Sequence, residues 1–600
     1  MRFHLYSLFM KILTVTIAIF LFAMPLSARE YHVSVNGSDA NSGSPEKPLK
    51  SIQKAAEMMQ PGDLCIVHEG VYREWVKPVR GGTSETQRIT FRAAPGEKVI
   101  IKGSEQVTGW KRHTANVWRL DIPDSFFGSF NPFKTNISGG WIKYGKEFHL
   151  GAFYLNGVSF NEKLDLDTVY SRKETYFIEA RPNVTSLYVN FSKTDPNAEL
   201  TEINVRECVF FPEIKGLQYI TVDGFTMMHA AANWTCFRAF QRALAGTYYG
   251  KHWIIENCII SDARCTGIVC GNDPSHEDEG FDAEAAGYHI IRNNEIRDCG
   301  QAGIHGFKGW TGSIIEGNLI ENISAKKEFG GYETGGIKLH DAVDVVVKNN
   351  IIRKVYVGGP GQYAGIWIDW GAQGTRVTGN VVYDMEASAL FLQNAHGPVL
   401  VDNNIFSGEI RSSMENCVYV HNLFIDCTWS YRAEKFSPVY WKPHTAVAVK
   451  TEPLSFKNDK NYNNIYIGNG TDKITPYPGF AIDWNIYYEG ALKSSFADKN
   501  SYSDTSFRAE AVIKTLPKGV EVSFNHSKDA TGLKAPAITH AFIGKFDPAS
   551  QGLEHHDGSP LNLDTDILGS PRTGKPAPGP LQDLKAGRNI LQLFAGPKFK

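Results

Sequence analysis

The residues best equipped for chemistry lie between Glu333 and Pro398. Three runs in this stretch alternate apolar and other side chains: GGIKLH (335–340), AGIWID (364–369) and ALFLQ (389–393). A period of two indicates strands with one buried face. The opposite face would then carry a carboxylate, an imidazole, an amine, an amide and aromatic rings together. This combination is typical of a cleft that binds a sugar.

The register of these strands follows from the asparagines that precede them. Asn294 precedes Phe307, and Asn380 precedes Gln393, by the same thirteen residues. The spacings from Asn350 to Asp369 and from Asn318 to His340 are longer, and apparent insertions at 358–363 and 325–333 account for the difference. Because neighbouring strands of a ladder lie about 4.8 Å apart, this register predicts outward rows on successive coils. One row is Phe307, His340, Asp369 and Gln393, and the other is His305, Lys338, Trp367 and Phe391.

A repeat of apolar strand, Asn or Gly turn, and apolar strand recurs nine times between residues 219 and 468, for example in HIIRNNEI (289–296) and VLVDNNIF (399–406). Repeats of this kind are the signature of a solenoid, in which each coil buries its apolar face only against its neighbours. We therefore predict an all-β fold, a right-handed parallel β-helix with an inserted antiparallel β-sandwich.

Changes in this pattern predict the domain boundaries. Residues 29–107 would form the first coils and a capping helix near 49–59, which protects the open end of the solenoid. Residues 108–205 have hairpin spacing, including the turn at Asn156-Gly157, and are too many for a structureless loop. The main helix would span 206–475, and 476–600 would form an irregular segment that packs along the coils or caps them.

Residues 1–28 have the layout of a secretory signal peptide, with Arg2 and Lys11 before an apolar run and Ser27-Ala28 at its end. An uncleaved anchor is the alternative, because Leu26 suits the cleavage motif poorly. We expect a secreted or periplasmic protein that has no membrane association after cleavage. The balance of 62 basic and 64 acidic residues gives no reason to expect nucleic acid as a partner. Assembly into a homo-oligomer stays open.

Nine cysteines occur without the spacing of a metal site. Buried free thiols are favoured over disulfides, since several fall at apolar positions of consecutive coils. The acidic run NDPSHEDEG (272–280) lacks the spacing of a known calcium loop, so a solvated loop is favoured over a calcium site. No other metal and no organic cofactor are expected.

Several segments together resemble glycoside hydrolase family 120, the β-xylosidases with a parallel β-helix and an inserted β-sandwich. They include GDLCIVHEGVYREWVKP (62–78), SFFGSFNPF (125–133), ETGGIKLHDAVDV (333–345), GIWIDWGAQGTRVTGN (365–380) and HGPVLVDNNIFS (396–407), and the similarity covers most of the chain after the leader. The block WIDWGAQGTR (367–376) is the most specific. The resemblance implies that Asp369 is the nucleophile of a retaining mechanism on xylosides or related plant glycans.

The chain departs from the family at the acid/base. The family has a Glu three residues before His-Gly-Pro, and that position here is Gln393. A retaining glycosidase needs a second carboxyl about 5–5.5 Å from the nucleophile, and an amide cannot carry its proton. The acid could come from Glu333, Glu386, His340 or His305, whereas Glu415 lies too many coils away. Alternatively, the mechanism needs no protein acid, or the chain binds glycans without cleaving them.

Other roles follow from position along the predicted cleft. Trp367 is expected to be a sugar platform, with a plain exposed aromatic as the alternative. Lys338, His340 and His305 would bind substrate, or Lys338 and His340 would only pair with Asp369. His396 and His444 match the family in position, and structural turn roles suit them equally. A polysaccharide lyase or epimerase is the rival activity, with Lys338 or His340 as the base.

Overall fold

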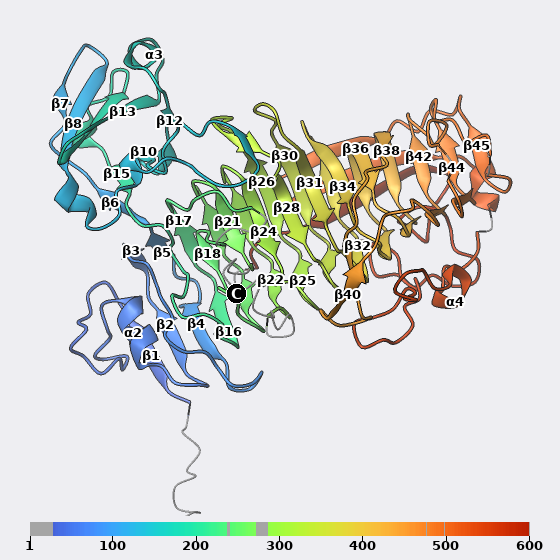
Figure 1. The fold of residues 1–600 in the computed structure, drawn as a ribbon, viewed down its shortest axis with the longest axis horizontal. Coiled ribbons are helices and arrows are strands. Elements are labelled where there is room, and N and C mark those ends of the chain that lie inside the picture. Colours follow the sequence, from blue (N-terminus) through green and yellow to red (C-terminus); the bar gives the residue numbers. More distant parts are fainter. Residues whose placement is uncertain are drawn as a thin grey trace, which may run out of the picture.

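The computed structural model describes residues 28–236, 241–271, 286–475, 477–496, 498–533 and 535–598. Its main body is a long parallel β-helix, seen from the side in Figure 1. Residues 1–27 of the predicted leader (1–28) lie outside the described residues, and so does the acidic run 272–280. No helix in the described part of the chain has the length and apolar character needed to cross a membrane.

Three parallel sheets run along the coil and are called here the first, second and third sheets. The first has the order β1 (Glu30–Val33), β2 (Leu64–Val67), β4 (Ile89–Ala93), β16 (Ile220–Asp223), β19 (Ile254–Glu256), β22 (Ile290–Arg292), β25 (Ile314–Glu316), β29 (Val346–Lys348), β32 (Thr375–Thr378), β35 (Val399–Asp402), β37 (Cys417–Val420), β41 (Lys460–Tyr462) and β43 (Ala481–Asp483).

The second sheet follows the turn after each of these strands. It contains β3 (Gly70–Tyr72), β5 (Val99–Lys102), β17 (Thr226–Met228), β20 (Ile259–Ser261), β23 (Glu295–Arg297), β26 (Leu319–Ile323), β30 (Ile351–Val355), β33 (Val381–Tyr383), β36 (Ile405–Ser413), β38 (Leu423–Tyr431), β42 (Ile465–Ile467), β44 (Ile486–Tyr488) and β45 (Tyr502–Asp504).

The third sheet carries the chemistry-bearing strands. It contains β18 (Ala245–Gly246), β21 (Thr266–Val269), β24 (Ala302–Phe307), β28 (Thr334–His340), β31 (Tyr363–Asp369) and β34 (Ser388–Gln393), and continues on the later residues of β36 and β38. Interior residues stack rung on rung, as Ile304, Ile337, Ile366 and Leu390 do with no exposed surface. The core is thus a continuous apolar column along the coil.

The Asn-rich turns between the first and second sheets have two roles. The first residue adopts positive φ, as in Asn293, Asn349 and Asn403, a conformation that Asn tolerates better than most residues. The next Asn is buried, and its amide donates to the asparagine of the following coil. For example, Asn380 Nδ2 donates to Asn404 Oδ1 at 3.0 Å. A buried amide ladder therefore fixes the register of successive coils.

The N-terminal end is covered by α2 (Ile52–Met58), within the predicted range of 49–59. The inserted segment follows β5 as two sheets. One has the order β11 (Val158–Ser159), β10 (Phe153–Leu155), β15 (Thr201–Asn204) and β6 (Ser104–Gln106). The other has the order β12 (Asn161–Glu162), β13 (Thr175–Arg181), β14 (Val184–Asn190), β8 (Val117–Pro123) and β7 (Lys111–Arg112).

The two sheets of the insertion share one apolar core that includes Phe153 and Leu187. They form the expected sandwich, although β12 and β13 pair in parallel. Figure 1 shows this unit projecting from the N-terminal part of the coil. A buried ion pair between Arg264 and Glu162, at 2.9 Å, fastens it to the β-helix.

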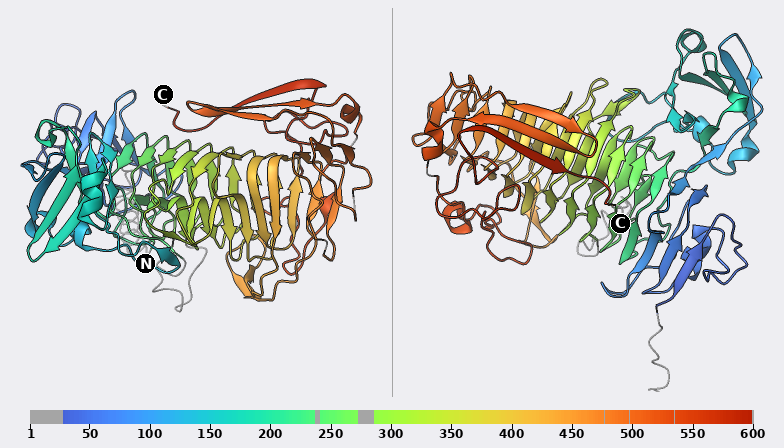
Figure 2. Two further views of the ribbon diagram at one scale, coloured as in Figure 1. Left: turned by 90° about the horizontal axis from the view of Figure 1, so that it is seen from above. Right: turned by 180° about the vertical axis from the view of Figure 1, so that it is seen from behind.

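The C-terminal segment differs in part from expectation. Parallel pairing continues through β43, β44 and β45, past the boundary predicted at residue 475. The chain then returns as an antiparallel sheet of β46 (Val512–Leu516), β47 (Gly519–His526) and β48 (Gly587–Phe594). This sheet lies along the flank of the coil (Figure 2), where Val522 and Leu591 pack with outward residues of the second sheet.

Candidate active site

The outer face of the third sheet brings the candidate residues together. His340 lies opposite Asp369, and Lys338 lies opposite Trp367, on β28 and β31. The predicted register is therefore confirmed, including both proposed insertions. On the adjacent coils, His305 pairs in register with Lys338, Phe307 with His340, and Trp367 with Phe391.

Lys338 occupies the centre of this cluster and has no exposed side-chain surface. Its ammonium contacts Asp369 Oδ2 directly and lies 3.8 Å from Glu333 Oε2. The same nitrogen is 3.7 Å from the centre of the Trp367 ring, a cation–π geometry. One cation thus holds two buried carboxylates and an aromatic ring in place.

Glu333 is held as a carboxylate. Its Oε2 lies 3.1 Å from His305 Nε2 and 3.0 Å from His340 Nε2. Burial would raise the pKa of Glu333, but Lys338, His340 and the hydrogen bonds from both histidines outweigh it and hold the pKa well below its ordinary value. Burial lowers the pKa of His305, so its ring contributes a hydrogen bond rather than a charge. Glu333 is therefore in the site but poorly suited to donate a proton.

Asp369 ends its strand with its side chain outward and its carboxylate oriented by two groups. Lys338 contacts Oδ2, and the backbone N–H of Trp370 donates to Oδ1 at 2.7 Å. Trp370 has a φ of 26°, a sparsely populated backbone conformation that turns its own N–H toward the carboxylate. This arrangement suits a nucleophile that is held in a fixed orientation.

Trp367 differs from the expected sugar platform because only 1% of it is exposed. Its ring packs on Phe391, with ring centres 4.9 Å apart. Its Nε1 donates to Gln393 Oε1 at 3.1 Å. Alternation along the strand correctly predicted that Trp367 faces outward, but not that neighbouring side chains cover it. Here the indole orients the Gln393 amide.

Two segments that have no place in the repeat form the walls. On one side β9 (Ile142–Tyr144), from the insertion, pairs with β27 (Gly330–Gly331). The ring centre of Trp141, just before β9, lies 5.9 Å from that of Tyr332. On the other side, in the connection after β38, the ring centre of Phe436 lies 5.9 Å from that of Trp370. Trp141 is 50% exposed and Phe436 is 45% exposed. These exposed aromatic side chains, which no repeat pattern in the sequence indicates, are better placed to stack on a sugar than Trp367.

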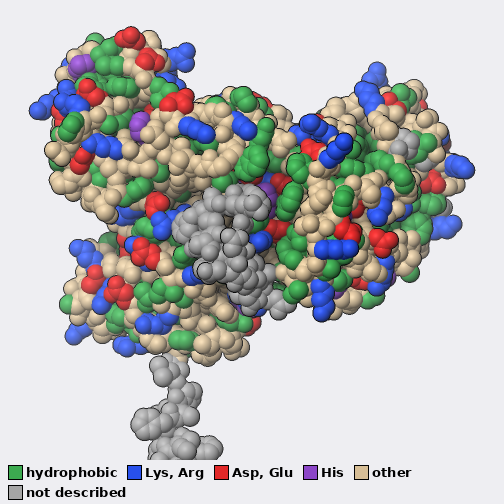
Figure 3. Space-filling view, in the orientation of Figure 1, with side chains coloured by type: hydrophobic (Ala, Val, Ile, Leu, Met, Phe, Trp, Pro, Cys, Tyr) green, Lys and Arg blue, Asp and Glu red, His purple; other side chains and the backbone are tan. Residues whose placement is uncertain are grey.

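The space-filling view agrees with this placement. Figure 3 shows acidic and histidine side chains in a hollow near the middle of the molecule, flanked by hydrophobic side chains. Figure 1, in the same orientation, places β24 and β28 there. The site is thus a recess in the face of the coil rather than an open surface.

The wall after β38 also contributes a carboxyl group. Gln393 Nε2 donates to Glu434 Oε2 at 3.3 Å. Glu434 follows β38 in a stretch that lacks the strand periodicity, so the sequence offered no signal that it would reach the site. The residue is partly exposed.

The remaining candidates lie in other ion pairs. Glu386 is bound to Lys327 at 2.6 Å on the surface, which lowers its pKa. His396 is held by Glu415 at 2.7 Å. His444 lies between Asp344, at 3.1 Å, and Glu554, at 3.0 Å. Among the described residues, none of these three candidates contacts the Lys338 cluster.

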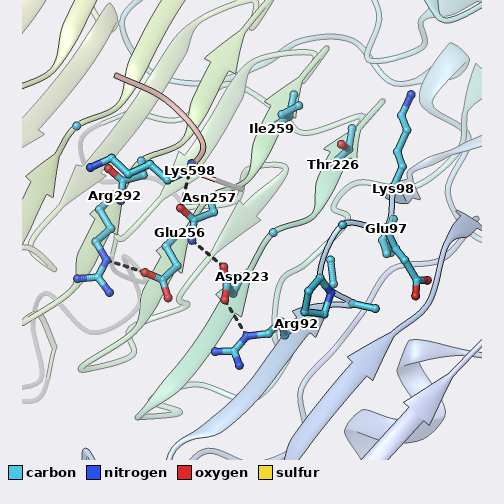
Figure 4. Close-up of a pocket in the computed structure, with 18 of the residues that line it drawn as sticks. Arg92, Glu97, Lys98, Asp223, Thr226, Glu256, Asn257, Ile259, Arg292 and Lys598 are labelled. Carbon is cyan, nitrogen blue, oxygen red and sulfur yellow. Dashed lines mark hydrogen bonds and ion pairs between the residues drawn. The ribbon is translucent and has the colours of Figure 1, made fainter. Parts of the chain in front are cut away.

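A cavity of about 1000 Å³ lies elsewhere, beside the turns between the first and second sheets (Figure 4). Four of its charged side chains form ion pairs with one another, Arg92 with Asp223 at 2.8 Å and Arg292 with Glu256 at 2.6 Å. Despite its size, it presents no cluster suited to bond cleavage, so we place the active site on the third sheet. No group of three or more potential metal ligands occurs within the described ranges.

Comparison with known proteins identifies the family. The structure described as the complex of XylC with xylose has 34% sequence identity to this chain and a TM-score of 0.87, and the match covers 94% of this chain and 100% of that one. The Glycoside hydrolase 120 insertion domain profile matches residues 107–181. The chain belongs to glycoside hydrolase family 120. A right-handed β-helix profile also matches residues 246–428.

Family membership confirms the predicted resemblance and fold class. It also makes the protein a glycoside hydrolase with a glycan substrate. An uncharacterised protein of Bacillus subtilis (strain 168), YwoF, is 39% identical over 72 residues, which are 12% of this chain and 15% of YwoF. The chain therefore spans only a small part of the length of that relative.

Proposed function

We propose that this family 120 protein is a secreted or periplasmic, exo-acting β-xylosidase that uses Asp369 as its nucleophile. The observation that carries the proposal is the carboxylate of Asp369, fixed by Lys338 and the Trp370 N–H on the outer face of β31. The xylose in the XylC complex supports xylosides as the first substrate class to test. Export rests on the leader-like sequence of residues 1–28.

In the proposed retaining reaction, an Asp369 oxygen forms a bond to the anomeric carbon while the bond from that carbon to the leaving oxygen breaks. A proton supplied by an acid neutralises the leaving oxygen. Water then attacks the anomeric carbon, loses a proton to the conjugate base, and displaces Asp369. Lys338 would hold the Asp369 carboxylate in a fixed orientation, and Gln393 would position the sugar through its amide.

The test is a screen of aryl glycosides with the wild type, Asp369→Asn and Gln393→Glu. We expect hydrolysis of a xyloside by the wild type and a loss of at least about 10³-fold in Asp369→Asn, because the covalent step needs the carboxylate. A gain of activity in Gln393→Glu would show that the cleft retains xyloside specificity around this position. Product stereochemistry by proton NMR tests retention.

Two outcomes would overturn the proposal. An unsaturated, ultraviolet-absorbing product from a uronate polymer would identify a lyase. Sugar binding that survives Asp369→Ala, without turnover of any glycoside in the screen, would identify a glycan-binding protein. Lys338 is a poor candidate for a lyase base because two carboxylates surround its ammonium.

A further inference from the structure

We infer that Glu434 is the proton donor of this enzyme, and that it takes the role for which Gln393 lacks a proton. The inference rests on the proposed glycosidase function. Glu434 Oε2 lies 3.3 Å from Gln393 Nε2. The carboxyl group thus stands beside the position that the family resemblance assigns to the acid/base, although it comes from a different element.

Position relative to the nucleophile supports the assignment. Gln393 follows Leu392, which pairs with Ile368, so Gln393 stands one rung from Asp369 in the same outward column. One rung is about 4.8 Å. The distance from Asp369 to a carboxyl group in contact with the Gln393 amide is therefore similar to the distances between catalytic carboxyls in glycosidases. These distances are about 5–5.5 Å for retaining and about 6.5–9.5 Å for inverting enzymes.

The other carboxyl groups considered for the role of the acid are bound to cations or histidines. Glu333 is surrounded by Lys338 and two histidines, which hold it ionised. Glu415 is bound to His396 at 2.7 Å, and Glu386 is bound to Lys327. Within the described residues, Glu434 has the hydrogen bond from Gln393 and no ion pair. Of these carboxyl groups, Glu434 is the one that can take up and release a proton without breaking an ion pair.

Access to substrate also favours Glu434. Its side chain is partly exposed, and its near neighbour Phe436 lies against Trp370, the residue directly after Asp369. The segment that carries Glu434 therefore reaches the rim of the recess beside the nucleophile. An acid in this position would meet the leaving group as it departs toward solvent.

The proposed step conserves atoms and charge. The protonated Glu434 transfers its proton to the leaving oxygen as that oxygen separates from the anomeric carbon and Asp369 bonds to the carbon. The Glu434 carboxylate then removes a proton from the attacking water, whose oxygen bonds to the carbon and releases Asp369. Both carboxyl groups end in their starting states.

The experiment compares the wild type, Glu434→Gln and the control Glu452→Gln on two xylosides. Glu452 pairs with exposed Lys450 in the hairpin that follows the wall segment. The first substrate has a dinitrophenolate leaving group, which needs no proton, and the second has an alkyl leaving group, which does. We expect Glu434→Gln to lose about 10²–10⁴-fold in kcat/KM on the alkyl xyloside. The loss of Glu434→Gln in kcat/KM on the dinitrophenyl xyloside should be much smaller.

Two further readouts separate an acid from a positioning residue. Removing the acid should abolish the alkaline limb of the pH profile, and azide should restore turnover of the dinitrophenyl xyloside as glycosyl azide. Equal losses on both substrates, or activity within threefold of the wild type, would overturn the assignment while leaving the proposed function standing. An inactive wild type would overturn both. Glu452→Gln should match the wild type.

Discussion

Replacement of Lys338 by Met tests the electrostatic design of the site. The substitution keeps a long apolar side chain but leaves Glu333 and Asp369 buried without their shared cation. At 3.8 Å and an effective dielectric constant of about 20, the attraction between Lys338 and Glu333 is about 4 kcal/mol. This agrees with the cost of about 3–5 kcal/mol for removing one partner of a buried ion pair. We expect a loss of that size in the free energy of unfolding at about pH 7.

The matched control is Lys348→Met. Lys348 pairs with Glu316 at 2.7 Å, but the two side chains are 35% and 25% exposed on the outer face of the first sheet. Solvent screens such a pair, so its loss should cost at most about 1 kcal/mol. Both variants are compared by equilibrium urea unfolding followed through tryptophan fluorescence.

The pH dependence gives a second, independent check. The depressed pKa of Glu333 stabilises the folded state above the ordinary carboxyl pKa of about 4.5, and this contribution is lost as the pH falls through the folded-state pKa. The difference between wild type and Lys338→Met should therefore narrow as the pH falls from about 4.5 toward the folded-state pKa of Glu333. A loss below about 1 kcal/mol at pH 7, or a difference that stays constant below about pH 4.5, would refute this account of the cluster.

Three further outcomes follow from the scaffold. Asn380→Ala should lower the free energy of unfolding by about 3 kcal/mol, because it leaves several buried groups of the asparagine ladder without hydrogen-bond partners. Urea unfolding measures this loss, and a loss under about 1 kcal/mol would contradict the role of the ladder. The hydrogen bond with Asp344 outweighs burial and raises the pKa of His444, so its contribution to stability is present below about pH 6.5 and lost as the pH rises through the folded-state pKa. The Tm difference between wild type and His444→Gln should accordingly be larger at about pH 6 than at about pH 9, and a constant difference would contradict it. All nine cysteines are free and buried, as with Cys258, whose pKa burial raises to about 12, so Ellman's reagent should react only after denaturation and should then titrate nine thiols.

The repeat made much of this architecture predictable. Alternation assigned the outward residues of β28, β31 and β34, and the buried Asn at each turn supplied the register that places His340 opposite Asp369. These features are local and recur in every coil, so the sequence reveals them. The free cysteines were predicted for the same reason, because they occupy small apolar positions of the interior.

The walls of the site were not predictable in the same way. Period-two alternation says which face a residue occupies, but not what covers that face, and Trp367 was therefore expected to be open to sugar. Glu434 and Trp141 belong to segments outside the repeat that fold back over the third sheet. Their positions depend on tertiary packing of irregular chain, which no local pattern encodes.

The two proposed reacting carboxyl groups are carried by parts of the protein with different constraints. Asp369 belongs to β31, whose backbone bonds to the coils on either side tie its location to the whole stack. Glu434 belongs to the connecting segment between β38 and the hairpin of β39 (Val439–Trp441) and β40 (Ala448–Thr451). Insertions or deletions in that segment can alter the distance between the proton donor and the nucleophile while the solenoid stays intact. A change in the length of this one segment would therefore be enough, during evolution of the scaffold, to replace the double displacement of a retaining enzyme by the direct attack of water in an inverting enzyme.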